Sequence, residues 1–200
     1  MSVFTPKANK GGDFVKCPPG THPAICMALI DLGTHKEVYK GTENKQRKIC
    51  MVFEVVEQAD SGDVRHFMTK EFNVAASEKS NLRKFAEAWR GKPYADGEDI
   101  PLTKFIGVAG LANVIEKGNY TALATMTQLP KGMPKPTPSK VPFTWEIGQG
   151  KPPEHDWLPF LWGKPIKDKI LASEEMKAGG KPATAAAAVE EGPAEEEIPF

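Results

Sequence analysis

Residues 48–74 read KICMVFEVVEQADSGDVRHFMTKEFNV, and this stretch decides the fold. Residues 48–58 are rich in β-branched and other apolar side chains, which is typical of a β-strand. The sequence DSGD at 60–63 consists of turn residues, and 65–74 reads as another strand. The stretch therefore predicts an antiparallel β-hairpin.

Further strands are expected on both sides of this hairpin. Residues 21–32 form an apolar, strand-like run that can continue through 35–39, whereas 40–47 is polar and reads as a loop. Later in the chain, strand-like runs occupy 105–115 and 120–129.

A helix is expected between the third and fourth strands, because the apolar period changes there from two to near 3.6. Ser77 or Ser80 can cap its start, and Gly91 sits where a left-handed C-cap belongs. The apolar residues that recur at i, i+3, i+4 and i+7 are Leu82, Phe85, Ala86 and Trp89.

The expected order is three strands, one helix and two strands, which is the connectivity of the OB-fold, a small Greek-key barrel. Gly33, Gly107 and Gly110 fit the sharp bends that such a barrel needs. We therefore predict a mainly β fold: a five-stranded OB-fold barrel with one helix between strands three and four. An α+β roll has the same elements and is the alternative.

Changes in composition divide the chain into four expected parts. A short helix is expected near 165–175, within the third part. The parts are a flexible N-terminal arm (1–20), the OB-fold domain (21–129), a Pro/Trp-rich extension packed on the barrel (130–176), and a disordered linker with an acidic tip (177–200).

The formal net charge of zero hides an asymmetry between these parts. Residues 177–200 hold two lysines and five glutamates, a net charge of −3. The other 176 residues hold 24 basic and 21 acidic side chains, a net charge of +3. A mildly basic body with an acidic tail suits a protein whose body meets phosphates and whose tail meets another partner.

The cysteines favour free thiols in a reducing compartment. Cys17, Cys26 and Cys50 are odd in number and lack close pairing, which argues against a disulfide framework. His22 invites a zinc site with the first two, but Cys26 and Cys50 fall inside strand-like runs, so burial is favoured. We expect no metal and no cofactor.

Other patterns narrow the class of protein. No stretch approaches the roughly 18 apolar residues of a membrane span, and no signal-peptide pattern is present, so we expect a soluble, cytoplasmic protein. Sequence motifs of P-loop enzymes, serine hydrolases and zinc proteases are missing, so we expect no enzyme.

The final residues combine negative charge with apolar groups: Glu195, Glu196, Glu197, Ile198, Pro199 and Phe200. A basic side chain of a partner can clamp the terminal carboxylate while the phenyl ring fills an apolar pocket. This segment closely resembles the acidic tip of bacterial single-stranded DNA-binding proteins, with Glu in place of Asp. The resemblance implies that it recruits host replication, recombination and repair proteins.

The body is similar to phage-encoded single-stranded DNA-binding proteins of the OB-fold type. This likeness implies that the protein coats and protects single strands inside a bacterial host cell. The segments that carry it are PGTHPA (19–24), IDLG (30–33), FEV (53–55) and KSNLRKFAEAWRG (79–91).

Sequence-tolerant binding of single strands needs cations that follow phosphates and rings that stack on bases. The hairpin of strands two and three is the usual binding surface of an OB barrel. In strand three, alternation places His66 and Lys70 on one face with Met68 and Phe72, a mixed face that could line a groove. The residues that we predict to bind DNA are Lys36, Tyr39, Lys40, Lys45, Arg47, Lys48, His66, Lys70 and Phe72.

Two other functions fit the same sequence. A strand-annealing recombination protein would pair complementary strands rather than only coat one. An interaction decoy would occupy host pockets through the tip without its body touching DNA.

Overall fold

The computed structural model describes residues 16–39, 41–60 and 62–179. Most of the predicted N-terminal arm, and residues 180–200 with the predicted tip, therefore lie outside the described residues. Within the described part, no helix is both long enough and apolar enough to cross a membrane.

The centre of the molecule is one open sheet with the strand order β3-β2-β1-β4-β5, and a sixth strand, β6, pairs with β1. Its five main strands pair antiparallel with their neighbours. The strands are β1 (Gly20–Tyr39), β2 (Thr42–Ala59), β3 (Gly62–Asn73), β4 (Ala109–Lys117), β5 (Tyr120–Gln128) and β6 (Phe143–Trp145).

The long strand β1 pairs with two different strands, β4 and β6, along one of its edges. Its first part pairs antiparallel with β4, from Gly20 opposite Val114 to Ile25 opposite Ala109. Beyond an irregularity near Cys26, β6 takes over as a parallel neighbour. A sixth strand from the C-terminal extension thus completes the pairing that β4 leaves unfinished.

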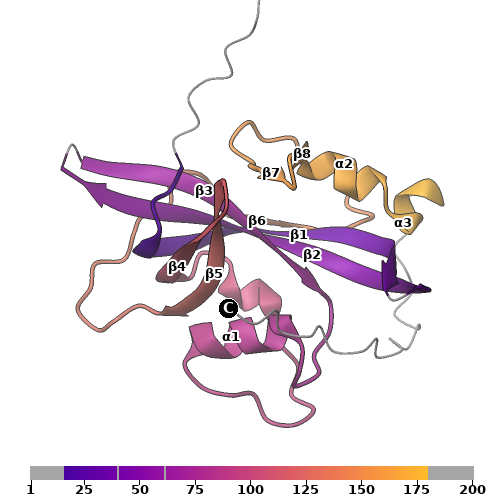
Figure 1. The fold of residues 1–200 in the computed structure, drawn as a ribbon, viewed down its shortest axis with the longest axis horizontal. Helices are drawn as coiled ribbons and strands as arrows, with labels where there is room; N and C mark the ends of the chain where they lie inside the picture. Colours follow the sequence, from indigo (N-terminus) through magenta and orange to yellow (C-terminus); the bar gives the residue numbers. More distant parts are fainter. Residues whose placement is uncertain (1–15, 40, 61, 180–200) are drawn as a thin grey trace, which may run out of the picture.

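Two apolar cores lie on opposite faces of this sheet (Figure 1). The helix-side core contains Met51 and Phe53 of β2 and the apolar stripe of α1 (Asn81–Arg90). The extension-side core contains Cys50 and Val52 of the same strand. The unbroken apolar run of residues 48–58 therefore reflects a strand that is buried on both faces, as such runs usually do.

The helix-side core is built around α1, which begins and ends as predicted. Ser80 Oγ accepts a hydrogen bond from Arg83 N at 3.1 Å, and Gly91 closes the helix with φ 73°. The ring of Trp89 stacks on Phe105, at the end of the 3-10 helix η1 (Leu102–Phe105), with centroids 4.7 Å apart. Gly110 of β4 is required here, because a Cβ would lie 2.6 Å from the Trp89 indole nitrogen.

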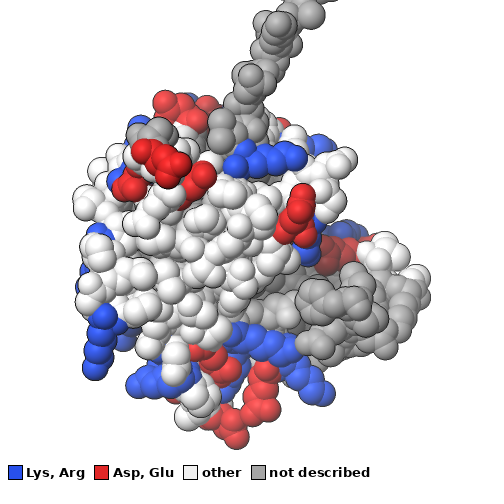
Figure 2. Space-filling view, turned by 60° about the vertical axis from the view of Figure 1, so that its left-hand side comes forward, with Lys and Arg blue, Asp and Glu red and all other residues white. Residues whose placement is uncertain are grey.

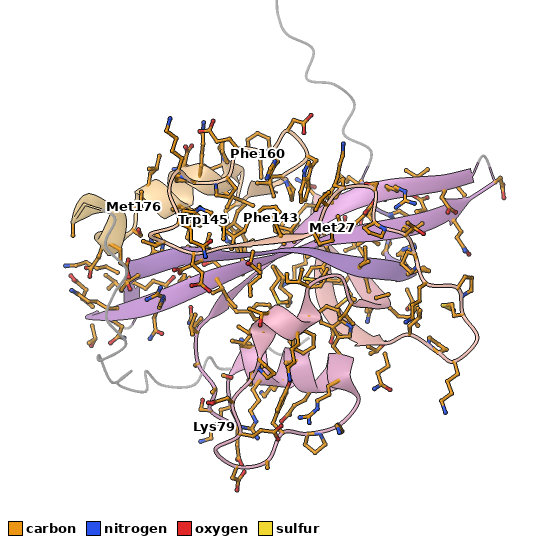
Figure 3. All side chains as sticks on the ribbon, turned by 180° about the vertical axis from the view of Figure 1, so that it is seen from behind. Met27, Lys79, Phe143, Trp145, Phe160 and Met176 are labelled. Carbon is orange, nitrogen blue, oxygen red and sulfur yellow. The ribbon has the colours of Figure 1, made fainter. Side chains whose placement is uncertain are left out.

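The extension-side core is covered by the chain after β6. Phe143 and Trp145 lie between the sheet and this layer (Figure 3), and Trp157 packs on Phe67 of β3 with centroids 5.1 Å apart. The layer consists of β7 (Phe160–Leu161), β8 (Lys164–Pro165), α2 (Ile166–Leu171) and α3 (Glu174–Lys177).

Comparison with the predictions gives a mixed result. The mainly β class, the order of three strands, one helix and two strands, and the helical turns near 165–175 are confirmed. The prediction of a closed five-stranded barrel is not: the sheet is open, and β3 and β5 are the ends of its strand order. The predicted polar loop at 40–47 is wrong, because residues 42–47 pair with 34–39.

The ribbon at 34–47 forms despite its polar sequence because backbone pairing does not require apolar side chains. Cross-strand charge pairs add to it, such as Lys36 with Glu43 at 2.5 Å.

Candidate nucleic-acid interface

The predicted basic residues of the β1–β2 ribbon are engaged by carboxylates. Lys36 pairs with Glu43, and Arg47 pairs with the buried Asp31 at 2.6 Å. Lys45 pairs with Glu174 of α3 at 2.9 Å. Each of these charges is therefore largely compensated within the protein.

Lys48, a predicted cation that follows this ribbon in β2, is also compensated and is buried. Its ammonium contacts Glu37 and lies 2.8 Å from Glu71 of β3. Tyr39 is the last residue of β1, and Lys40 lies outside the described residues.

The predicted face of β3 exists but points into the protein. Phe72 is 4% exposed in the helix-side core, and its ring centroid lies 4.9 Å from that of Phe85. His66 is buried, with Nε2 2.7 Å from a Glu57 carboxylate oxygen. The prediction that this face lines an open groove is therefore wrong for these two residues, because Phe72 packs against Phe85 of α1 and His66 is buried beside Glu57.

The opposite face of β3 is covered by the extension. Phe67 packs under Trp157, and Glu71 accepts hydrogen bonds from the Lys169 ammonium and the Trp162 indole N–H. Neither face of the β2–β3 hairpin is thus a free binding platform. Figure 2 shows that the middle of the side it presents is largely uncharged and that side chains of both signs lie around it, so no single basic patch is seen on this side.

A pocket of about 270 Å³ lies where β3, β5 and α1 meet. Lys70 of β3 reaches across this seam, and its Nζ donates a hydrogen bond to the Leu123 carbonyl of β5 at 2.9 Å. The pocket is lined by Lys70, Glu71, Phe72, Asn81, Lys84, Phe85, Ala124 and Thr125.

The charge in this pocket is not neutralised. No carboxylate of the described residues lies within 4.0 Å of the Lys70 ammonium. Lys84, in the first turns of α1, is exposed and likewise lacks an ion-pair partner in that part of the chain. Glu71 lines the pocket, but its carboxylate oxygens bond to groups on the other face of β3.

Burial lowers the pKa of Lys70, and the nearby positive charge of Lys117 lowers it further. The ammonium lies about equally far from two aromatic rings, 5.7 Å from the Phe72 centroid and 5.6 Å from that of Phe85. An anion that entered the pocket would supply the negative charge that is missing beside the Lys70 ammonium. The N-terminus of α1 at Asn81 adds to the attraction for an anion.

Sequence reasoning singled out two of the eight residues that line this pocket as DNA contacts and not the other six. Lys70 and Phe72 were predicted as DNA contacts, whereas Asn81, Lys84 and Thr125 were not. Lys84 lies off the apolar stripe of the helix, and that pattern alone indicates only a solvated side chain. Its place in the pocket depends on β5 lying opposite β3, which no local pattern encodes.

Neither a search for metal ligands nor comparison with known proteins identifies a further functional residue. In residues 16–179, where described, no three His, Cys, Asp or Glu side chains converge to hold a metal ion. Comparisons with protein families, with characterised proteins and with solved structures found no match.

Proposed function

We propose that the protein binds single-stranded DNA without sequence preference and coats it during replication or recombination in a bacterial host. The observation that carries this proposal is the pair of uncompensated lysines, Lys70 and Lys84, at the open seam between β3 and β5. Phosphate is the anion that such a site suits, because a backbone phosphate can accept from two ammonium groups.

The topology supports a body of the OB type. An OB barrel has three strands, a helix and two strands, with the helix at one end of the barrel. Here the order β3-β2-β1-β4-β5 would close into such a barrel if β3 and β5 paired. The Lys70 hydrogen bond to Leu123 spans this seam. We propose that the fold is an OB-type barrel left open at the seam.

The proposed interface differs from the sequence-based one. Lys36, Lys45, Arg47 and Lys48 are held by carboxylates, so they are secondary to the seam. The tip at 195–200 stays a prediction from the sequence, in which it recruits host repair and replication proteins.

The proposal is tested by fluorescence anisotropy with labelled oligo-dT at about 50 mM salt, with wild type and the double variant K70Q/K84Q. Glutamine removes the charge and keeps an N–H donor on a side chain one bond shorter, and thermal unfolding of the variant checks that the fold is retained. We expect weaker binding and a salt slope reduced by about 0.7 for each phosphate that the variant no longer neutralises.

K151Q is the matched control, because Lys151 is an exposed lysine of the extension outside the seam. It should leave the affinity nearly unchanged. Equal affinities of wild type and K70Q/K84Q would contradict a phosphate site at the seam. An annealing assay with complementary labelled strands separates a coating protein from an annealing protein, and lack of any oligo-dT binding would favour the decoy.

A further inference from the structure

The β7–β8 hairpin presents two aromatic rings to solvent. Phe160 is 65% exposed and Trp162 is 73% exposed, although Leu161 between them is buried in the extension-side core. Figure 3 shows Phe160 on the outer side of the extension, away from the sheet. Burying Leu161 anchors the hairpin, so the rings are held on a supported surface rather than on a loose loop.

The backbone at Trp162 is unusual for such a large residue. Its φ of 53° is the one positive value at a non-glycine residue in the described chain, and Gly163 follows with φ 74°. Leu161 pairs with Lys164, so the two residues form the tight turn of the hairpin. A bulky side chain in this conformation is strained, and such strain is often kept at functional positions.

The ring of Trp162 is oriented but not covered. Its indole N–H donates to Glu71 at 3.0 Å, while Lys48 and Lys169 hold the same carboxylate. Among the described side chains, no aromatic or cationic group stacks on the Trp162 ring. One edge of the indole is therefore tethered, and its faces are left open.

The position of Glu71 links this ring to the seam. Glu71 lines the pocket that holds Lys70 and Lys84, and it also anchors Trp162. β3, which carries Glu71, is at one end of the strand order of the sheet. Lys164, exposed beside the turn, has no carboxylate within ion-pair distance in the described chain.

We propose that Trp162, with Phe160, is a stacking platform for bases of the single strand whose phosphates lie in the seam pocket. This inference rests on the proposed function. A single-stranded nucleic acid offers both chemistries at once, since its phosphates match the uncompensated lysines and every base has a face that stacks on an indole.

The test compares W162G with wild type in oligo-dT binding and in thermal unfolding. Glycine favours the positive φ, which offsets the lost hydrogen bond to Glu71 and the added freedom of the unfolded chain, so the variant should unfold near the wild-type temperature. Loss of one stacked base should weaken binding about fivefold or more. W162F keeps a ring but loses the hydrogen bond to Glu71, so its affinity for oligo-dT should lie between those of wild type and W162G.

Two controls distinguish stacking from a structural effect. L171A removes an exposed aliphatic side chain of the same layer and should bind as wild type does. An oligonucleotide with abasic sites keeps the phosphates but lacks bases, so wild type and W162G should bind it equally.

The outcomes are separable. Equal binding of oligo-dT by wild type and W162G would overturn the platform and leave the seam in place. A wild type that does not bind oligo-dT at about 50 mM salt would overturn both proposals. A weakened W162G whose defect persists on abasic DNA would also overturn the platform.

Discussion

Lys70 is the residue on which the proposed function depends most. It is a partly buried cation whose ammonium bonds to one carbonyl and lies near two aromatic rings, and nearby Lys117 disfavours its charged form further. Without an anion, burying this charge destabilises the fold, whereas a bound phosphate would relieve that cost. The residue is thus better suited to the bound state than to the free one.

The lowered pKa of Lys70 predicts a pH effect with opposite signs for binding and stability. As the pH rises through this pKa, the ammonium loses its proton and its attraction for phosphate. The affinity for DNA should therefore fall at a pH below about 10.4, the ordinary pKa of lysine. The folded state binds fewer protons than the unfolded state there, so stability should rise.

Anisotropy titrations from neutral to alkaline pH, beside urea unfolding at the same values, measure both trends. K70R keeps its charge throughout and is the control, because arginine does not lose its proton in this range. If K70R loses affinity with pH as steeply as wild type, Lys70 is not the titrating contact.

The cysteines provide a second prediction at the residue scale. Burial raises the pKa of Cys17 to about 11, with a contribution from Glu57, and that of Cys26 to about 12. Burial also raises the pKa of Cys50. Because the thiolate is the reactive form, none of the three should react with a thiol reagent in the native protein.

Ellman's reagent added before and after denaturation measures this reactivity. We expect reaction of three thiols in denaturant and almost none in native buffer. Rapid reaction of a native thiol would mean that the strand bearing it opens readily.

The extension is the element that most changes the expected surface. It adds β6 to the edge of β1 and covers the face of β2 and β3 opposite α1. The part of the extension before β6 is held as well, since the fully buried Glu54 accepts hydrogen bonds from Arg65 at 2.7 Å and from Ser139 N at 2.9 Å. This layer is therefore part of the folded body.

Trp145 tests how the extension is held. It is 7% exposed within the extension-side core, yet its indole N–H has no hydrogen-bond partner among the described residues. W145A should lower the free energy of unfolding by about 3–5 kcal/mol, because it leaves a large cavity. W145F removes the unsatisfied donor and most of the ring remains, so it should cost less than about 1.5 kcal/mol.

Urea unfolding of both variants shows whether Trp145 stabilises the extension through the volume of its ring or through a hydrogen bond of its indole N–H. If W145F were as destabilised as W145A, the indole N–H would be making a bond that stabilises the extension.

The sequence predicted where the helix and strands lie better than it predicted which elements pack against one another. Alternation grouped His66, Lys70 and Phe72 correctly on one face of β3, but period two does not say which face meets α1. The apolar run at 48–58 located β2, and its lack of alternation was the sign that both faces are buried. The pairing of residues 34–39 with 42–47 was missed because charges there suggest a loop.

At the scale of the whole molecule, charge is divided between a mildly basic body and an acidic tail of five glutamates at 190–200. If the tail competes with DNA for the body, deletion of 190–200 should raise DNA affinity, most strongly at low salt. Anisotropy titrations at two salt concentrations compare the full chain with the deletion. Equal affinities at low salt would contradict competition by the tail.

The central claim is that a single strand follows the free edge of β3, from the seam pocket to the β7–β8 hairpin. The most direct measurement is photo-cross-linking of the full chain to an oligonucleotide containing 5-iododeoxyuridine, followed by mass spectrometry of the peptides. We predict cross-links at residues 70–84 and 160–164. Cross-links confined to the ribbon at 34–47, or none at saturating oligonucleotide, would contradict the claim.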